Sequence, residues 1–205
     1  FKPQRRINEV ELPSPDQKLE ILHLVGERLA SAGYVYIGMD HFARPDDELA
    51  VAQRDGELYR NFQGYSTHAH CDLVALGVTS IGMVGNTYAQ NMRTLDDYYA
   101  RIDAGELAVF RGIELNRDDE LRRAVITHLI CNFSLDTDKV GRDWDIRFEE
   151  YFADELTRLD TMSNDGLLSI DGPRIEVLPA GRLLIRNICM VFDQYLGADG
   201  QTARF

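Results

Sequence analysis

The run RNFQGY at residues 60–65 places a cation, an amide and two aromatic rings close together. An aromatic face attracts cationic groups, and an amide can both donate and accept a hydrogen bond. Phe62 and Gln63 could therefore contact a polar or cationic ligand together. Taken by themselves, the same residues also suit an ordinary core phenylalanine and a loop-capping amide, which is the favoured interpretation from the residues alone.

Two further groups of polar residues lie near this run. Asp40 and His41 offer a carboxylate next to an imidazole. Adjacent residues on an extended chain point to opposite sides, so this pair is expected to brace its loop rather than to exchange protons. Arg44 and Arg60 could pair with the carboxylates of a ligand, because a guanidinium suits bidentate recognition. Ion pairs within the protein are the more common fate of such arginines.

The histidines and cysteines do not form a convincing metal motif. His68, His70 and Cys71 stand in the sequence HAHC. Three ligands so close together, with no fourth in view, are weak evidence, so no metal site is predicted. Cys131 and Cys189 lie far from Cys71 and from each other, so neither a CxxC pair nor a disulfide framework is expected. This cysteine usage fits a reducing compartment.

The composition limits the partners of the chain. It has 205 residues, of which 34 are acidic and 22 basic, and its net charge of −12 repels phosphate backbones. Nucleic acid is therefore not an expected partner. No run of about 18 apolar residues and no basic-then-apolar leader is present, so a cytoplasmic location without membrane association is expected. Because the sequence starts Phe1-Lys2-Pro3, we expect a fragment of a longer protein.

The residues up to position 92 are expected to form α/β structure. Ser14, Pro15 and Gln17 form a capping-box pattern that predicts a helix ended by Gly33. Buried strands are predicted at 34–37 and 78–84, with a short helix at 46–55 between them. Strands that alternate with helices favour parallel pairing, and ligands then collect at the carboxyl ends of the strands. RNFQGY belongs to the long connection that follows the first of these strands.

The residues from 93 onwards are expected to be mainly helical. The predicted elements are a helix, a strand, two helices, a hairpin and a last helix (94–105, 107–115, 117–131, 144–161, 167–178 and 180–195). This order is typical of a winged helix, which raises DNA binding as one possible function. The segment that would be the recognition helix, WDIRFEEYFADELTRLD, is rich in carboxylates, so a DNA-binding module is kept only as the least favoured alternative. A packing domain, or a cover for a neighbouring active site, is expected instead.

Several long motifs in one order carry a family resemblance. YIGMDHFARPDDELAVAQ, RNFQGYST, GVTSIG, RGIELNRDDELRRAVITHLICNFSLD and GRLLIRNICMVFDQYL together resemble the C-terminal half of oxygen-independent coproporphyrinogen III oxidases, which are radical S-adenosylmethionine enzymes. The resemblance covers nearly the whole chain. It implies the last β/α units of an incomplete (β/α) barrel at 1–92, followed by a helical, winged-helix-like domain at 93–205.

The resemblance also implies a reaction. In such enzymes S-adenosylmethionine and a [4Fe-4S] cluster generate a 5′-deoxyadenosyl radical, and two propionates of coproporphyrinogen III become the vinyl groups of protoporphyrinogen IX. An electron acceptor of unknown identity and a monomeric state are implied as well. The cluster motif CxxxCxxC is absent from this sequence, so its cysteines are expected before Phe1, and the fragment alone is expected to be inactive.

The resemblance assigns cofactor contacts to three residues. Phe62 and Gln63 match family positions beside S-adenosylmethionine, and Ile81 matches a position that touches the adenosine. The small residues around Ile81, among them Gly82, would let a strand approach a cofactor closely. A haem chaperone of the same superfamily is the alternative function, and the motifs MDHFA and RNFQGY favour the oxidase.

Overall fold

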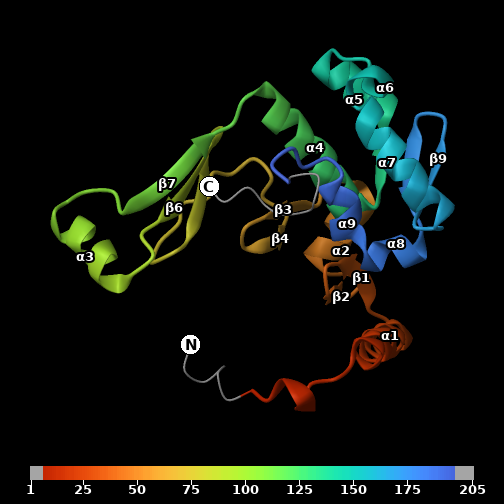
Figure 1. Ribbon diagram of the computed structural model, residues 1–205, viewed down its shortest axis with the longest axis horizontal. Coiled ribbons are helices and arrows are strands. Elements are labelled where there is room, and N and C mark those ends of the chain that lie inside the picture. The colour runs from red at the N-terminus through yellow and green to blue at the C-terminus, as the bar shows by residue number, and fades with distance from the viewer. Residues whose placement is uncertain (1–6, 197–205) are drawn as a thin grey trace.

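The N-terminal part of the chain is built from one long helix and two hairpins. The computed structural model describes residues 7–196, shown in Figure 1. After a short 3-10 helix, η2 (Glu9–Glu11), comes α1 (Pro15–Ser31), and the Ser14 capping box that begins it is present as predicted. Next come β1 (Val35–Gly38), β2 (His41–Ala43), α2 (Glu48–Asp55), β3 (Tyr59–Asn61) and β4 (Gly64–Ser66).

The predicted parallel pairing is wrong. Strand β1 pairs with β2 antiparallel, and β3 pairs with β4 antiparallel. A tight turn joins the two strands of each hairpin, such as the one in which Met39 and Asp40 adopt positive φ, and a turn that short can only return the chain antiparallel. The four sheets of residues 7–196 remain separate, so no closed barrel forms within them.

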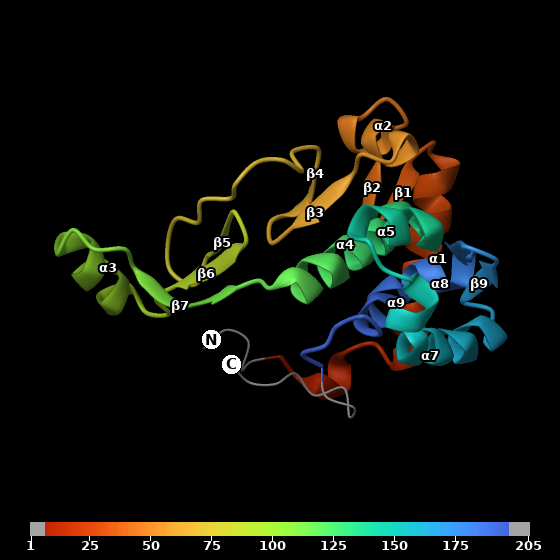
Figure 2. The same cartoon turned by 90° about the horizontal axis from the view of Figure 1, so that it is seen from above.

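A second sheet forms an arm with one helix. Strands β5 (Ile81–Val84), β6 (Thr87–Asn91) and β7 (Val109–Glu114) pair in that order, all antiparallel, and α3 (Leu95–Asp103) connects β6 to β7. Thr94 accepts a hydrogen bond from the Asp97 amide and so caps the start of α3. Figure 2 shows this arm extending to one side of α4 (Arg117–Asn132).

The other side of α4 carries the main hydrophobic core. The remaining elements are β8 (Ser134–Asp136), α5 (Thr137–Trp144), α6 (Phe148–Tyr151), α7 (Ala153–Asn164), β9 (Leu168–Asp171), β10 (Arg174–Val177), α8 (Pro179–Leu183) and α9 (Ile185–Met190). The predicted hairpin is β9–β10, and β8 extends its sheet in the order β8-β10-β9. Phe148, Phe152 and Phe192 pack at the centre of this core.

Three predicted elements of the second region differ from the structure. The helix predicted at 144–161 is divided, because α5 ends at Trp144 with a left-handed Asp145 and a turn at Phe152 separates α6 from α7. The helix predicted at 180–195 is likewise divided at Leu184. The strand predicted at 107–115 is β7, which pairs with β6 and not with β9–β10. The winged-helix arrangement built on that strand is therefore not the one observed.

No helix within residues 7–196 combines the length and the apolar character that crossing a membrane requires.

Candidate active-site cavity

A cavity with polar and apolar walls lies where three parts of the chain meet. Its volume is about 560 Å³, within the range of small-molecule sites, and α4 forms its floor. The β3–β4 hairpin, β5 and β6 close one side, and the segment 192–195 closes the other. Aromatic and aliphatic side chains make up about half of the wall. Apart from tyrosines, the polar residues on it are Arg60, Asn61, Asp119, Arg122, Arg123, Thr127, Asp193 and Gln194.

The tip of the β3–β4 hairpin carries two of the predicted site residues. The Gln63 amide donates a 2.8 Å hydrogen bond to Asn61 Oδ1, which fixes the turn. Phe62 lines the cavity, remains 50% exposed, and packs edge-to-face on Tyr88 with 5.1 Å between the ring centroids. Gln63 is exposed and lines a neighbouring cavity of about 440 Å³, which shares Asn61 with the first.

Ile81 lies close to this cavity but does not line it. It begins β5, two residues before Met83, so both side chains lie on the same face of the strand, and Met83 does line the cavity. The sequence predicts that a cofactor approaches Gly82 closely, but in the structure it is the backbone at Leu73 that does so. A Cβ on Gly82 would lie 2.8 Å from the Leu73 carbonyl oxygen. The cofactor contacts of Phe62, Gln63 and Ile81 remain predictions.

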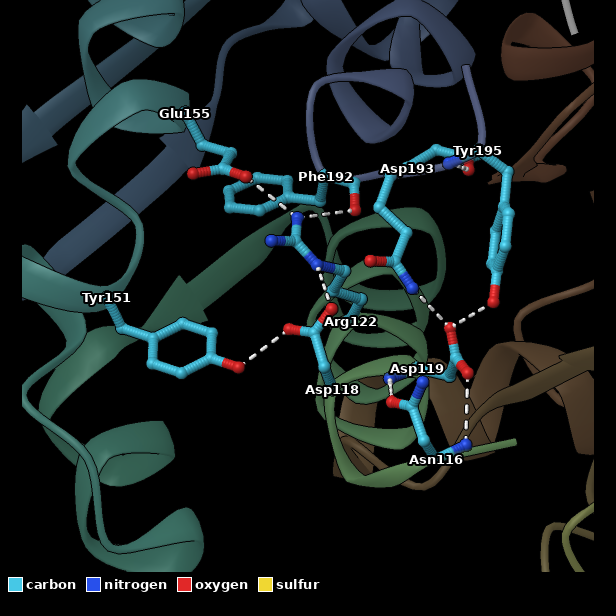
Figure 3. Close-up of polar contacts among 10 residues, drawn as sticks. Asn116, Asp118, Asp119, Arg122, Tyr151, Glu155, Phe192, Asp193 and Tyr195 are labelled. Carbon is cyan, nitrogen blue, oxygen red and sulfur yellow. Dashed lines mark hydrogen bonds and ion pairs between the residues drawn. The ribbon is translucent and has the colours of Figure 1, made fainter. Parts of the chain in front are cut away.

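An ionic network holds α4 against the core (Figure 3). Arg122 donates to Asp118 at 2.8 Å, to Glu155 on α7 at 2.7 Å and to the Phe192 carbonyl at 3.1 Å. Burial by itself would lower the pKa of Arg122, but the hydrogen bonds to Glu155 and Asp118 outweigh it and raise that pKa. Because three acceptors engage this guanidinium, its role is to position the helix.

A second polar cluster fixes the segment that closes the cavity. Asp119, only 7% exposed, accepts hydrogen bonds from Gln194 Nε2 at 2.5 Å and from the Tyr195 hydroxyl at 2.8 Å. Its other oxygen accepts from the backbone amide of Asn116, as part of the capping box that starts α4. Figure 3 shows these groups converging on the first turn of the helix. One buried carboxylate thus joins the helix start to the 193–195 segment.

The remaining predicted candidates lie outside the cavity. His41 contacts the Met39 carbonyl through Nδ1 at 2.8 Å, which agrees with a loop-bracing role. Arg44 pairs with Asp46 at 3.3 Å on the surface. His70 and Cys71 line a separate cavity of about 570 Å³, and residues 7–196 contain no group of three or more His, Cys, Asp or Glu placed to hold a metal ion.

The cysteines of the described chain do not suit an iron–sulfur cluster. Burial raises the pKa of Cys131 to about 12 and that of Cys189 to about 12, whereas a cluster ligand must be a thiolate. Cys71 is exposed and belongs to no CxxxCxxC motif. These residues therefore do not fit the group that the family resemblance implies.

The sequence interpretation missed the contribution of α4 to the cavity. Asp119, Arg122 and Arg123 lie within RDDELRRA, which reads as an ordinary charged helix start. The capping box Asn116-x-x-Asp119 could have been recognised from spacing. The meeting of this helix with residues 193–195 joins positions more than 70 apart in the sequence, and no local pattern signals it.

Comparison with solved structures defines the class of protein. The fold matches a structure described as "Coproporphyrinogen III oxidase (HemN) from Escherichia coli is a Radical SAM enzyme", with a TM-score of 0.92 and 54% identity over 96% of this chain and 45% of that chain. The chain thus has the fold of part of a radical S-adenosylmethionine enzyme. Residues 115–184 match the family model described as the HemN C-terminal domain.

Curated relatives specify the family. The chain is 54% identical over 196 residues to the oxygen-independent coproporphyrinogen III oxidase of Pseudomonas aeruginosa, covering 96% of this chain and 43% of that protein. It is 52% identical over 205 residues to the Escherichia coli enzyme of the same name, covering 100% of this chain and 45% of that protein. Over nearly its whole length, this chain is therefore similar to part of the oxygen-independent coproporphyrinogen III oxidases. It spans a little under half the length of these relatives.

Proposed function

We propose that this chain supplies the C-terminal part of an enzyme that decarboxylates coproporphyrinogen III to protoporphyrinogen IX without oxygen. The supporting observation is the similarity to the Escherichia coli coproporphyrinogen III oxidase structure, with 54% identity and a TM-score of 0.92 over 96% of this chain. The two reacting propionates each lose CO₂ and hydrogen and become vinyl groups. The cavity over α4, with apolar walls and arginines at its edge, has the character that an apolar ring with carboxylates requires.

The hairpin tip is proposed to face the cofactor. In the whole enzyme, S-adenosylmethionine and a [4Fe-4S] cluster would supply the radical chemistry, and Phe62 and Gln63 would help to hold S-adenosylmethionine. Phe62 is half exposed, and within residues 7–196 no partner is found for the Gln63 side-chain amide, so both are available to a ligand. Ile81 is proposed to contact the adenosine from the β5 face that it shares with Met83. The cluster ligands are proposed to come from outside this chain.

The remaining expectations complete the proposal. The enzyme is cytoplasmic and monomeric, passes electrons to an acceptor of unknown identity, and binds no nucleic acid. A mainly helical domain follows a boundary near residue 92 and covers the active site. Its winged-helix-like part has β8, in place of β7, as the strand that joins the β9–β10 hairpin.

Anaerobic turnover by the full-length protein tests the function. With S-adenosylmethionine, a reductant and coproporphyrinogen III, the products should be protoporphyrinogen IX and CO₂ in a ratio of one to two. The haem chaperone alternative predicts tight haem binding without conversion of the porphyrinogen. Haem binding together with absent turnover in cluster-loaded protein would reject the oxidase.

A further inference from the structure

One cation on the cavity wall lacks a hydrogen-bond partner. Arg60, on β3, lines the cavity, and its Nη1 atom is buried without any partner within residues 7–196. Its guanidinium lies over the Tyr65 ring, 5.1 Å from the centroid, which orients the group but satisfies none of its N–H donors. A buried donor without a partner is costly, and Arg60 also lines the cavity, which points to a ligand there that draws the guanidinium into hydrogen bonds.

Other buried polar atoms do not share this position. Asn132 Oδ1 and Thr137 Oγ1 also lack partners among the described residues, but both are neutral and neither residue lines this cavity. Arg60 is therefore distinguished both by its charge and by its place.

Three other charged side chains of the cavity already make hydrogen bonds within the protein. Arg122 is bound by Asp118, Glu155 and the Phe192 carbonyl, and Asp119 is bound by Gln194 and Tyr195. The Asp193 carboxylate accepts from the Tyr195 amide at 2.9 Å.

Arg123 is a second cation on the cavity wall whose guanidinium makes only long polar contacts within residues 7–196. It lies 3.8 Å from Glu120 and makes long contacts of 3.4 Å to the Tyr88 hydroxyl and 3.7 Å to Met83 Sδ. None of these is a short charge-assisted hydrogen bond. The cavity thus presents unsatisfied positive charge within a chain of net charge −12.

We infer that Arg60 binds a carboxylate of the substrate in this cavity, with Arg123 as the second cation beside the aromatic wall. A guanidinium matches a carboxylate bidentately, and Phe62 and Tyr88 suit the apolar ring that carries it. The inference rests on the proposed function, in which that carboxylate is a propionate of coproporphyrinogen III. It adds a substrate-binding residue distinct from the cofactor-facing tip.

Binding of two probes to the full-length protein tests the inference. Coproporphyrin III carries the propionates of the substrate on an air-stable ring, and its tetramethyl ester has the same ring with every carboxylate capped. Wild-type protein should bind the acid more tightly than the ester in fluorescence titrations. Arg60→Gln should weaken binding of the acid by about 10- to 100-fold, the effect of losing hydrogen bonds to a charged group, while binding of the ester stays within about threefold.

Two further variants complete the design. Arg44→Gln removes an exposed arginine already paired with Asp46 and should leave both affinities unchanged. Arg60→Lys keeps the charge without the planar fork and should weaken acid binding by about tenfold. If Arg60→Gln does not fold, as judged by circular dichroism, wild-type affinity in Arg60→Lys overturns the inference.

The possible outcomes distinguish a failure of the Arg60 inference from a failure of the proposed function on which it rests. If the wild-type protein turns over coproporphyrinogen III but does not distinguish acid from ester, or if Arg60→Gln distinguishes them as well as the wild type does, the inference fails and the proposed function stands. If the wild-type protein neither turns over the porphyrinogen nor binds the acid, the proposed function itself fails. A purely structural Arg60 predicts a lowered melting temperature with unchanged discrimination.

Discussion

At the scale of single residues, the β3–β4 tip shows how neighbours in the sequence acquire different surroundings. Asn61 holds the turn, Phe62 lies on the α4 cavity, and Gln63 lies on the adjoining cavity. Because the hairpin tip borders two cavities, it can contact a ligand in each of them. This arrangement agrees with a cofactor that contacts both residues at the tip and an apolar substrate that lies against Phe62 in the α4 cavity.

Replacing Gln63 with alanine tests the cofactor side. In the full-length enzyme Gln63→Ala should lower turnover by about 10- to 100-fold, since a hydrogen bond to a charged group contributes about 1.5–3 kcal/mol. The melting temperature should stay unchanged because the side chain is exposed. Anaerobic turnover and thermal unfolding are measured on the same preparation.

Gln53 provides the matched control. Its Nε2 donates to the Ile37 carbonyl at 2.7 Å and to the Cys131 carbonyl at 2.8 Å, so it joins two elements inside the core. Gln53→Ala should lower the melting temperature and leave the turnover of the folded fraction near normal. A Gln63→Ala variant that behaves in the same way would show that Gln63 is structural.

At the scale of elements, α4 connects the cavity to the core. Its N-terminal turn carries Asp119, its middle carries Arg122 and Arg123, and further along His128 faces α5. One helix therefore joins the cavity floor, the ionic network and the α5 interface. A change of charge at that interface is expected to affect the stability of the whole unit.

His128 makes this stability depend on pH. Burial lowers the pKa of His128 below its ordinary value of 6.5, and Lys139 lowers it further, against a smaller opposite effect of Asp143. The unfolded chain therefore binds a proton at higher pH than the folded chain does. The His128 contribution to stability is present above pH 6.5 and is lost as the pH falls from 6.5 to the folded pKa, with a slope of at most about 1.4 kcal/mol per pH unit.

Urea unfolding of the 205-residue chain between pH 7.5 and 5 measures this slope. His128→Gln should remove the His128 part of it. His23→Gln, which changes an exposed histidine on α1, controls for the general effect of losing one histidine. An unchanged pH dependence in His128→Gln would contradict the assignment.

At the scale of the whole molecule, the cysteines set a limit on what this chain does alone. Two of its three thiols are buried in the core, and only Cys71 is exposed. We expect anaerobic reconstitution with iron and sulfide to give no stoichiometric [4Fe-4S] cluster and no decarboxylation. Absorbance and iron analysis measure the first, and product formation the second. A loaded, active chain would contradict this prediction.

Thiol titration of the native chain checks the cause. Cys71 should react with a disulfide reagent at pH 8 without delay. For Cys131, a pKa raised from 9.0 to about 12 lowers the thiolate fraction about 1,000-fold, so this thiol, like Cys189, should react only after denaturation. Rapid reaction of all three native thiols would show that the core is open.

The sequence alone determined what depends on neighbouring residues. The Ser14 and Thr94 caps, α2, β7 and the β9–β10 hairpin were predictable, because capping and turn chemistry act over a few positions. The resemblance to oxygen-independent coproporphyrinogen III oxidases was also recognisable, since the motifs that carry it span nearly the whole chain. Helix 144–161 was mispredicted, because its apolar period continues through the breaks at Asp145 and Phe152.

Only the tertiary structure decided the strand pairing and the cavity. Antiparallel pairing follows from tight turns whose positive-φ residues, Met39 and Asp40, the sequence did not mark. Asp119 accepts a hydrogen bond from Tyr195, and Arg60 lines the same cavity as α4, although these residues lie far apart in the sequence. Such contacts depend on how the elements pack and not on local propensity. Burial, which leaves Arg60 Nη1 without a partner and keeps Cys131 protonated, is likewise a property of the packed molecule.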